Sequence, residues 1–457
     1  MSLDSDRDHF DALRGRTSES QAYHERAAAV TPLGVESNVR SVDPYPFYLG
    51  EAEGSYVTDI DGNRYLDFLQ GLGPTILGHG DERVTAAAKE QIDRCAEVAA
   101  IPQTVAIEYM EKVRDMTPSI ETVRLANSGS EATMHAIRVA RSYTGRTKIA
   151  KPEGGYAGAH DYALQSVYAS EEALGPADRP NTVSYGTGIP DAVGETVVAF
   201  PFNDREATEE ILREHADDTA AVILEPVLAS CGVLKPRDGY HEFLRELTEE
   251  LGIVLIWDEV MTGFRLGPAS AQGRFGVTPD MTTFAKVAGG GFQLGGFGGR
   301  EDIMAEIEPP ANEEDEKWHS SAFHGGTYNG HPVSCAAGLA TLEIIDEEPV
   351  FETIEAYAED LFSGLQAVAD DVGVDAVVEH VGSMGQVFMM DESPVTYRDT
   401  WDADADLFRD WWFEAAARGA LFGNHQQFER FFTSYSNTDE QIEEALEIAE
   451  EAFRAVK

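Results

Sequence analysis

The chain has 457 residues, 82 of them acidic and 34 basic, which gives a formal net charge of −48. This excess of negative charge repels phosphate backbones and anionic lipid headgroups, so it argues against a nucleic-acid or membrane-surface partner. With 42% hydrophobic and 9% aromatic residues, the composition is that of a globular protein. A chain of this length predicts a large enzyme-sized domain and a smaller one.

The distribution of charge and the cysteines indicate the cellular environment in which the protein works. Acidic residues are spread over the whole chain, and only eight of the basic residues are lysines. Because unscreened like charges destabilise a compact state, we expect a salt-rich cytoplasm; an ordinary acidic enzyme is the alternative. Cys95, Cys231 and Cys335 lie far apart and predict neither a disulfide framework nor a zinc site. The amino terminus has no apolar targeting stretch, and no apolar run is long enough to span a membrane, so we expect a cytoplasmic protein.

Strand and helix patterns alternate along the chain. A hairpin is predicted around Asp61-Gly62, after a polar amino-terminal lead. Further on, continuously apolar runs at 220–224 and 253–257 predict buried strands, and the helical pattern between them ends at Gly252. Shorter strands are expected at 122–126 and 148–150. Strand, helix and strand in this order predict a mainly parallel sheet of the α/β class.

Two later segments have a different character. Residues 165–195 lack periodicity and are rich in Gly, Pro, Ser and Tyr, which is typical of a mobile loop or lid near a site. Near the carboxyl end, Thr438 opens a final helix with a capping-box pattern.

A carboxylate and a lysine carry the first chemical hypothesis. Asp258 ends a buried apolar strand, where open α/β sheets bind ligands, and its desolvation calls for a cationic partner. Lys286 precedes Gly289-Gly290-Gly291 in a chain that is otherwise poor in lysine. A lysine amine can form a Schiff base, so the pair suggests a pyridoxal-phosphate enzyme. A sheet-end cap for Asp258 and a surface position for Lys286 are the alternatives.

Two glycine-containing segments support the same hypothesis. Ser128-Gly129-Ser130 opens a predicted helix, whose free N–H groups and dipole suit a phosphate. An ordinary N-cap is the alternative. Tyr156 lies in a Gly-rich turn and could stack on a flat ring, or it could be a core tyrosine.

These elements, in this order, resemble the class III aminotransferase family of pyridoxal-phosphate enzymes, fold type I. The resemblance is carried by residues 255–291 and by the motifs D-G-N-R-Y-L-D, N-S-G-S-E-A-T-M, I-L-E-P-V and G-V-T-P-D-M-T-T-F. It implies a large domain with a mainly parallel sheet flanked by helices, and a smaller α+β domain. The implied boundaries are 1–74 for an amino-terminal part of the small domain, 75–330 for the large domain, and 331–457 for the rest of the small domain.

The resemblance also implies roles for residues around pyridoxal 5'-phosphate. Lys286 would be the catalytic residue that bonds to the cofactor, and the other cofactor contacts would be Ser128, Gly129, Ser130, Tyr156, Glu225, Asp258 and Val260. Thr327 would reach the phosphate of a neighbouring subunit, which implies a homodimer with shared sites.

The implied substrates are a small amino donor and acceptor, but their identity stays open. Within the family the pattern is most similar to glutamate-1-semialdehyde 2,1-aminomutases, for which Arg40 would hold the substrate carboxylate and Glu429 would lie near its amino end. Surface salt bridges are the alternative for both. Departures at Ala157, Gln293 and the segment from His425 fall on the substrate side. We therefore favour transfer between two molecules, an aminotransferase, over the aminomutase.

Other chemistries have weaker support. A nucleotide-dependent dehydrogenase needs G-x-G-x-x-G between a strand and a helix, and the glycines at 295–299 do not have this context. His79, His324 and His331 lack metal-ligand spacing, so no metal site is predicted.

Overall fold

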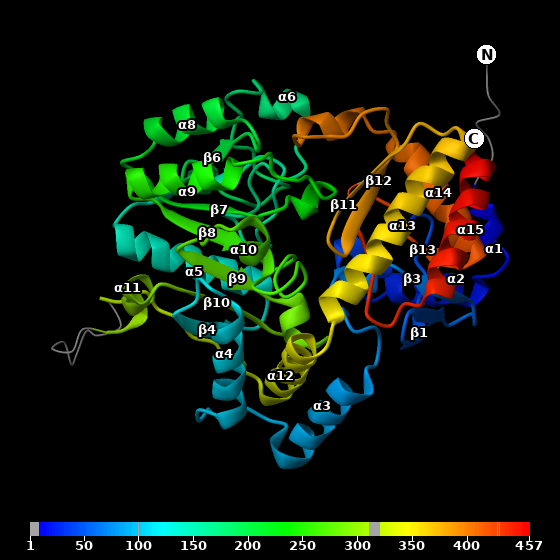
Figure 1. Cartoon of the computed structure of the whole chain (residues 1–457), viewed down its shortest axis with the longest axis horizontal. Coiled ribbons are helices and arrows are strands. Elements are labelled where there is room, and N and C mark those ends of the chain that lie inside the picture. Colours follow the sequence, from blue (N-terminus) through cyan, green and yellow to red (C-terminus); the bar gives the residue numbers. More distant parts are fainter. Residues whose placement is uncertain (1–8, 99, 310–319, 427, 429) are drawn as a thin grey trace.

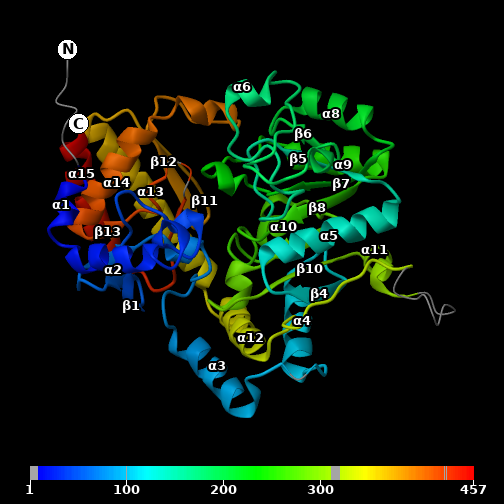
Figure 2. The ribbon, with the colours of Figure 1, turned by 180° about the vertical axis from the view of Figure 1, so that it is seen from behind.

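The computed structural model describes residues 9–98, 100–309, 320–426, 428 and 430–457. Two bodies lie side by side, one built on a large sheet and one containing both ends of the described chain (Figure 1 and Figure 2). Within the described residues, no helix is long and apolar enough to cross a bilayer.

The large sheet has seven strands in the order β4-β10-β9-β8-β7-β5-β6. All neighbours pair in parallel except β10, which runs antiparallel to β4 and β9. Its strands are β4 (Thr122–Ala126), β5 (Lys148–Pro152), β6 (Val197–Phe200), β7 (Thr219–Leu224), β8 (Val254–Asp258), β9 (Met281–Phe284) and β10 (Gly295–Gly299). The mainly parallel α/β sheet predicted from the sequence is confirmed.

Helices cover both faces of this sheet, which explains the continuously apolar strands. Along β8, Leu255 and Trp257 belong to a core cluster with residues of α8 (Arg205–Glu214) and α9 (Tyr240–Leu251). The alternate residue Ile256 packs in a second cluster with α5 (Gly129–Thr144). Because successive side chains of a strand point to opposite faces, β8 is apolar at both sets of positions.

The second body contains residues from early and late in the described chain. The strands β1 (Leu49–Glu53), β2 (Tyr56–Asp59) and β3 (Arg64–Asp67) form a sheet that β13 (Ala420–Leu421) extends. A three-stranded sheet contains β11 (Val377–Val381), β12 (Met384–Phe388) and β14 (Phe431–Phe432). The hairpin predicted around Asp61-Gly62 corresponds to β2 and β3. The domain boundaries stay a prediction.

The remaining helices complete the two bodies. Thr438 caps the last of them with the predicted capping box. They are α1 (Asp11–Arg14), α2 (Ser18–Ala28), α3 (Glu82–Cys95), α4 (Thr104–Met116), α6 (Glu171–Leu174), α7 (Asp191–Gly194), α10 (Ser270–Phe275), α11 (Glu301–Met304), α12 (Pro332–Glu347), α13 (Val350–Val372), α14 (Ala405–Arg418) and α15 (Asp439–Val456).

The segment 165–195 is held at its base by buried polar groups. Lys151 is fully buried and donates to the Gln165 carbonyl at 2.6 Å. Arg398 donates to the Gly175 carbonyl at 2.6 Å and pairs with buried Glu153 at 2.8 Å. The start of the segment is thus fixed to β5 at Gln165, and Gly175 is fixed to Arg398; the movement of the segment as a lid stays a prediction.

Candidate active site

A cavity of about 530 Å³ opens at the carboxyl ends of the parallel strands. Asn127 follows β4, Glu225 follows β7, Asp258 ends β8, and Lys286 follows β9, and all four line the cavity. In parallel sheets this edge is where ligands bind, since loops from several strands converge there. The sheet therefore brings together side chains that are up to 159 positions apart in the chain (127 to 286).

Asp258 is a buried carboxylate that faces this cavity. One of its oxygens accepts hydrogen bonds from the Val260 N–H at 3.0 Å and the Thr283 hydroxyl at 3.1 Å. Burial, and then the nearby charge of Glu225, raise its pKa to about 7, and Lys286 acts in the opposite direction. A cationic group bound beside it would stabilise its charged form.

Lys286 enters the cavity from an unusual backbone position. Its φ of 47° lies in the left-handed region, which is costly for a residue with a side chain and recurs at functional sites. The chain then turns through Gly290, where an added Cβ would lie 2.6 Å from the Ala337 carbonyl. The glycines after Lys286 therefore allow a tight approach to α12.

The start of α5 forms one end of the cavity. Ser128 is the N-cap, and its hydroxyl accepts from the Glu131 N–H at 3.2 Å, so the N-cap alternative holds for this side chain. The Ser130 hydroxyl accepts from the Ala159 N–H at 2.9 Å. A Cβ at Gly129 would come within 2.8 Å of Val260. The helix start thus lies against the cavity with its N–H groups and dipole available to a phosphate.

Tyr156 and Glu225 line the same cavity. Tyr156 is 39% exposed, and its backbone N–H donates to the Ser230 hydroxyl at 3.0 Å. Glu225 is buried and accepts from the Ser230 hydroxyl and, at 3.1 Å, from the Ser230 N–H. Burial raises the Glu225 pKa, whereas Ser230 and the positive charge of Arg430 oppose this shift.

Other predicted site residues lie apart from the cavity. Thr327 is exposed and lines a separate cavity of about 530 Å³ beside Arg124. Arg40 is exposed and pairs with Glu36 at 3.5 Å. It does not line the Lys286 cavity, although Asn38 and Val39 do. Glu429 lies outside the described residues.

The sequence reasoning missed Arg430. Its side chain lines the Lys286 cavity and the residue is only 8% exposed. Arg430 is followed by Phe431 and Phe432, which are both buried, and this apolar run is the one signal in the sequence that could have pointed to a buried cation. Burial raises the pKa of both Glu225 and Tyr156, and the positive charge of Arg430 opposes the rise in each case.

The lining of the cavity fits pyridoxal phosphate. The helix start suits a phosphate, Tyr156 presents an aromatic ring, and Asp258 suits a protonated ring nitrogen. Lys286 supplies an amine to the same space. Among the described residues, no group of three His, Cys, Asp or Glu side chains could hold a metal ion.

The family model for class III aminotransferases matches residues 38–453. The chain belongs to the class III aminotransferase family. Its cofactor is pyridoxal phosphate, and its fold is that of the fold type I transaminases and aminomutases, as the resemblance implied.

Sequence relatives point to one branch of the family. The glutamate-1-semialdehyde 2,1-aminomutase of Natranaerobius thermophilus is 39% identical, and the match covers 96% of this chain and 98% of the relative. Other relatives with this name are 36–39% identical. These relatives favour the aminomutase over the aminotransferase that the sequence analysis preferred.

Solved structures point also to transaminases. An ω-transaminase from Sphaerobacter thermophilus is 31% identical with a TM-score of 0.89, and the match covers 98% of this chain and 99% of that one. A transaminase with bound pyridoxal phosphate is 30% identical with a TM-score of 0.85, with 96% of this chain and 98% of that one covered.

Proposed function

We propose that this family member is an aminotransferase that moves an amino group from a small amine or amino acid to a keto acid or aldehyde. The observation that carries this proposal is Arg430, a buried guanidinium in the cavity that contains Lys286. A permanently charged, planar guanidinium binds a carboxylate in a bidentate manner. It therefore suits a substrate carboxylate, which in an aminotransferase would include that of the keto acid acceptor.

The cofactor-binding residues would act together. Bound pyridoxal phosphate supplies an aldehyde that reacts with amines and a ring that delocalises negative charge. Lys286 would hold the cofactor, and Asp258 would keep the ring nitrogen protonated. Ser128, Gly129 and Ser130 would bind the phosphate through the start of α5.

The remaining site residues would orient the reacting groups. Tyr156 and Val260 would pack on the two faces of the cofactor ring, and Glu225 would lie near its oxygen side. Once its amine is free, Lys286 would remove the proton from the amine-bearing carbon of the substrate. Arg430 would align the carboxylate of the acceptor.

The second candidate is glutamate-1-semialdehyde 2,1-aminomutase, which moves the amino group within one molecule. The observation that favours it is the shared name of the sequence relatives at 36–39% identity. In that case Arg40 and Glu429, as the family pattern implies, would contact the substrate.

One experiment separates the two candidates. Purified holoenzyme is mixed with glutamate 1-semialdehyde alone, and separately with a panel of amines and amino acids plus a keto acid. We expect a new amino acid only when donor and acceptor are both present. Rapid isomerisation of glutamate 1-semialdehyde without a keto acid would overturn the aminotransferase and establish the second candidate.

We also propose a homodimer in which Thr327 reaches the partner's phosphate. Exposed apolar side chains gather near the cavity that Thr327 lines, among them Ile101 at 69%, Phe323 at 58% and Tyr328 at 61% exposure. Large exposed apolar side chains near one another mark interaction sites. Light scattering should give twice the 49.9 kDa chain mass. A monomer with full activity would contradict this arrangement.

We further propose that the enzyme works in a salt-rich cytoplasm. The formal charge of −48 opposes compaction of the chain. Salt weakens this repulsion, because the Debye screening length falls from about 10 Å at 0.1 M to about 3 Å at 1 M. Thermal melts in increasing KCl should show a rising melting temperature. Equal stability at low and high KCl would leave an ordinary acidic enzyme as the better description.

A further inference from the structure

A second cavity continues from the Lys286 cavity towards the amino-terminal segment. Its volume is about 900 Å³. Asn38, Val39, Tyr168 and Tyr185 line both cavities, so the two spaces meet at these residues. We call the second space the outer cavity. A substrate bound at Lys286 can therefore extend into it.

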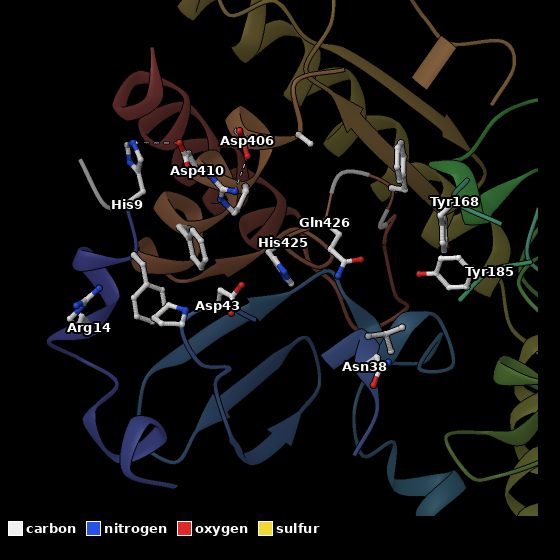
Figure 3. Close-up of a pocket in the computed structure, with 17 residues that line it drawn as sticks. His9, Arg14, Asn38, Asp43, Tyr168, Tyr185, Asp406, Asp410, His425 and Gln426 are labelled. Atoms are coloured by element: carbon white, nitrogen blue, oxygen red, sulfur yellow. Dashed lines mark hydrogen bonds and ion pairs between the residues drawn. The ribbon is translucent and has the colours of Figure 1, made fainter. Parts of the chain in front are cut away.

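Figure 3 shows how the outer cavity is built. Tyr168 and Tyr185 lie at one end, and His9 and Arg14 lie at the other. Between these ends lies Asp43, from the segment before β1. Aromatic rings form the end next to the Lys286 cavity: Tyr168 contacts Tyr185 edge-on at 5.8 Å and lies parallel to Phe428 at 6.3 Å.

Carboxylates outnumber arginines in the lining of the outer cavity, with Asp43, Asp406 and Asp410 against Arg14 and Arg409. Arg409 pairs with Asp406 at 2.8 Å and with Asp410 at 3.4 Å. Arg14 pairs with Asp11 at 3.2 Å. Asp43 is exposed, and it has no hydrogen-bond or ion-pair partner within the described part of the chain. The unbalanced charge is negative, so the cavity favours a cation over an anion.

We infer that the outer cavity binds the distal ammonium group of a long amino donor, a diamine or a diamino acid, while the reacting amine lies at Lys286. This inference rests on the proposed aminotransferase function. Aromatic rings attract an ammonium group through their faces at the end next to the Lys286 cavity, and the Asp43 carboxylate, farther along the outer cavity, can form an ionic contact with an ammonium group that reaches it. The inner cavity with Arg430 serves the acceptor carboxylate, so the two ends of the site differ in the charge that they select.

The test compares amines that differ only in the distal group. Holoenzyme without a keto acid is titrated with straight-chain monoamines from butylamine to octylamine, and with the diamines of the same length. The change in visible absorbance of the bound cofactor gives an apparent affinity. We expect at least one diamine to bind about fivefold or more tighter than its matched monoamine, beyond the statistical factor for two amines.

Three variants test whether the preference for diamines arises in the outer cavity. Asp43→Asn should reduce the ratio of diamine to monoamine affinity to near one, since the carboxylate charge is lost. Gln426→Lys adds a cation to the lining of the outer cavity and should have the same effect by repulsion. Asp371→Asn is the matched control, because Asp371 is an exposed carboxylate on α13 away from both cavities; its ratio should equal that of the wild type.

The outcomes separate this inference from the proposed function. Equal affinities for monoamine and diamine in the wild type, or an unchanged ratio in both Asp43→Asn and Gln426→Lys, would overturn the distal ammonium site and leave the aminotransferase intact. An absorbance that responds to no amine would overturn the proposed function itself.

Discussion

The two sides of the Lys286 cavity differ in how firmly the protein holds them. On the cofactor side, Asp258 and Glu225 are buried at strand ends and accept hydrogen bonds from neighbouring backbone N–H groups. On the substrate side, Tyr168 is 36% exposed and Tyr185 is 49% exposed. The side chains of the proposed chemistry therefore lie on the sheet, whereas the side proposed to bind the substrate is built from loops and the amino-terminal segment.

The largest effect should come from replacing the lysine on the cofactor side. Lys286→Ala removes the amine that would hold the cofactor and move the proton, so turnover should fall by at least about a thousandfold. The visible band of a lysine-bound cofactor should be absent before any amine is added. Retained turnover in a folded Lys286→Ala protein would remove Lys286 from the mechanism.

Asp258→Asn should have the next largest effect. The amide has no negative charge to keep the ring nitrogen protonated, so turnover should fall by about a hundredfold or more, while the hydrogen bonds from Val260 and Thr283 can persist. Cofactor content, measured after denaturation, shows whether binding survives. A variant that keeps both cofactor and turnover would show that the charge of Asp258 is unimportant.

Variants of two arginines test which of them binds the substrate carboxylate. Arg430→Gln should raise KM for the keto acid by about tenfold or more, because a buried charge-assisted contact is lost. Arg40→Gln should change it by less than about threefold, since the Arg40 side chain is 62% exposed. The opposite ranking in steady-state kinetics would assign the carboxylate clamp to Arg40, as the family pattern implies.

The smallest expected effect is a pH-dependent change in the unfolding free energy of the apoprotein. Burial raises the Asp258 pKa from 3.8 to about 7, so the folded apoprotein holds a proton that the unfolded chain releases. The resulting stabilisation is present below pH 3.8 and is lost as the pH rises towards 7. Relative to Asp258→Asn, the wild-type apoprotein should lose about 1–4 kcal/mol of unfolding free energy between pH 4 and 8.

Denaturant melts of both apoproteins at a series of pH values measure this difference. The same melts with bound cofactor are the control. A cationic ring nitrogen beside Asp258 should then reduce the pH-dependent difference in unfolding free energy between the two proteins. A pH-independent gap between the two apoproteins would contradict the raised pKa.

The sequence predicted the cofactor side better than the substrate side, for a physical reason. Asp258 lies at the end of a strand that an apolar run reveals, so its place at the ligand-binding edge follows from a parallel sheet. Lys286 was singled out by the glycines after it, and β9 before it (Met281–Phe284) was not predicted. Arg430 reaches the same cavity from a segment without periodicity, and no spacing rule predicts this. Arg40 was predicted to contact the substrate, yet its neighbours Asn38 and Val39 line the cavity and Arg40 does not.

The bond between Lys286 and the cofactor can be tested directly. Borohydride traps a bond between a lysine amine and the cofactor aldehyde, and peptide mass mapping then identifies which of the eight lysines carries the cofactor. We expect one cofactor per chain, attached to Lys286. A cofactor attached to buried Lys151 or to another lysine, or a chain that carries none, would contradict the central role assigned to Lys286.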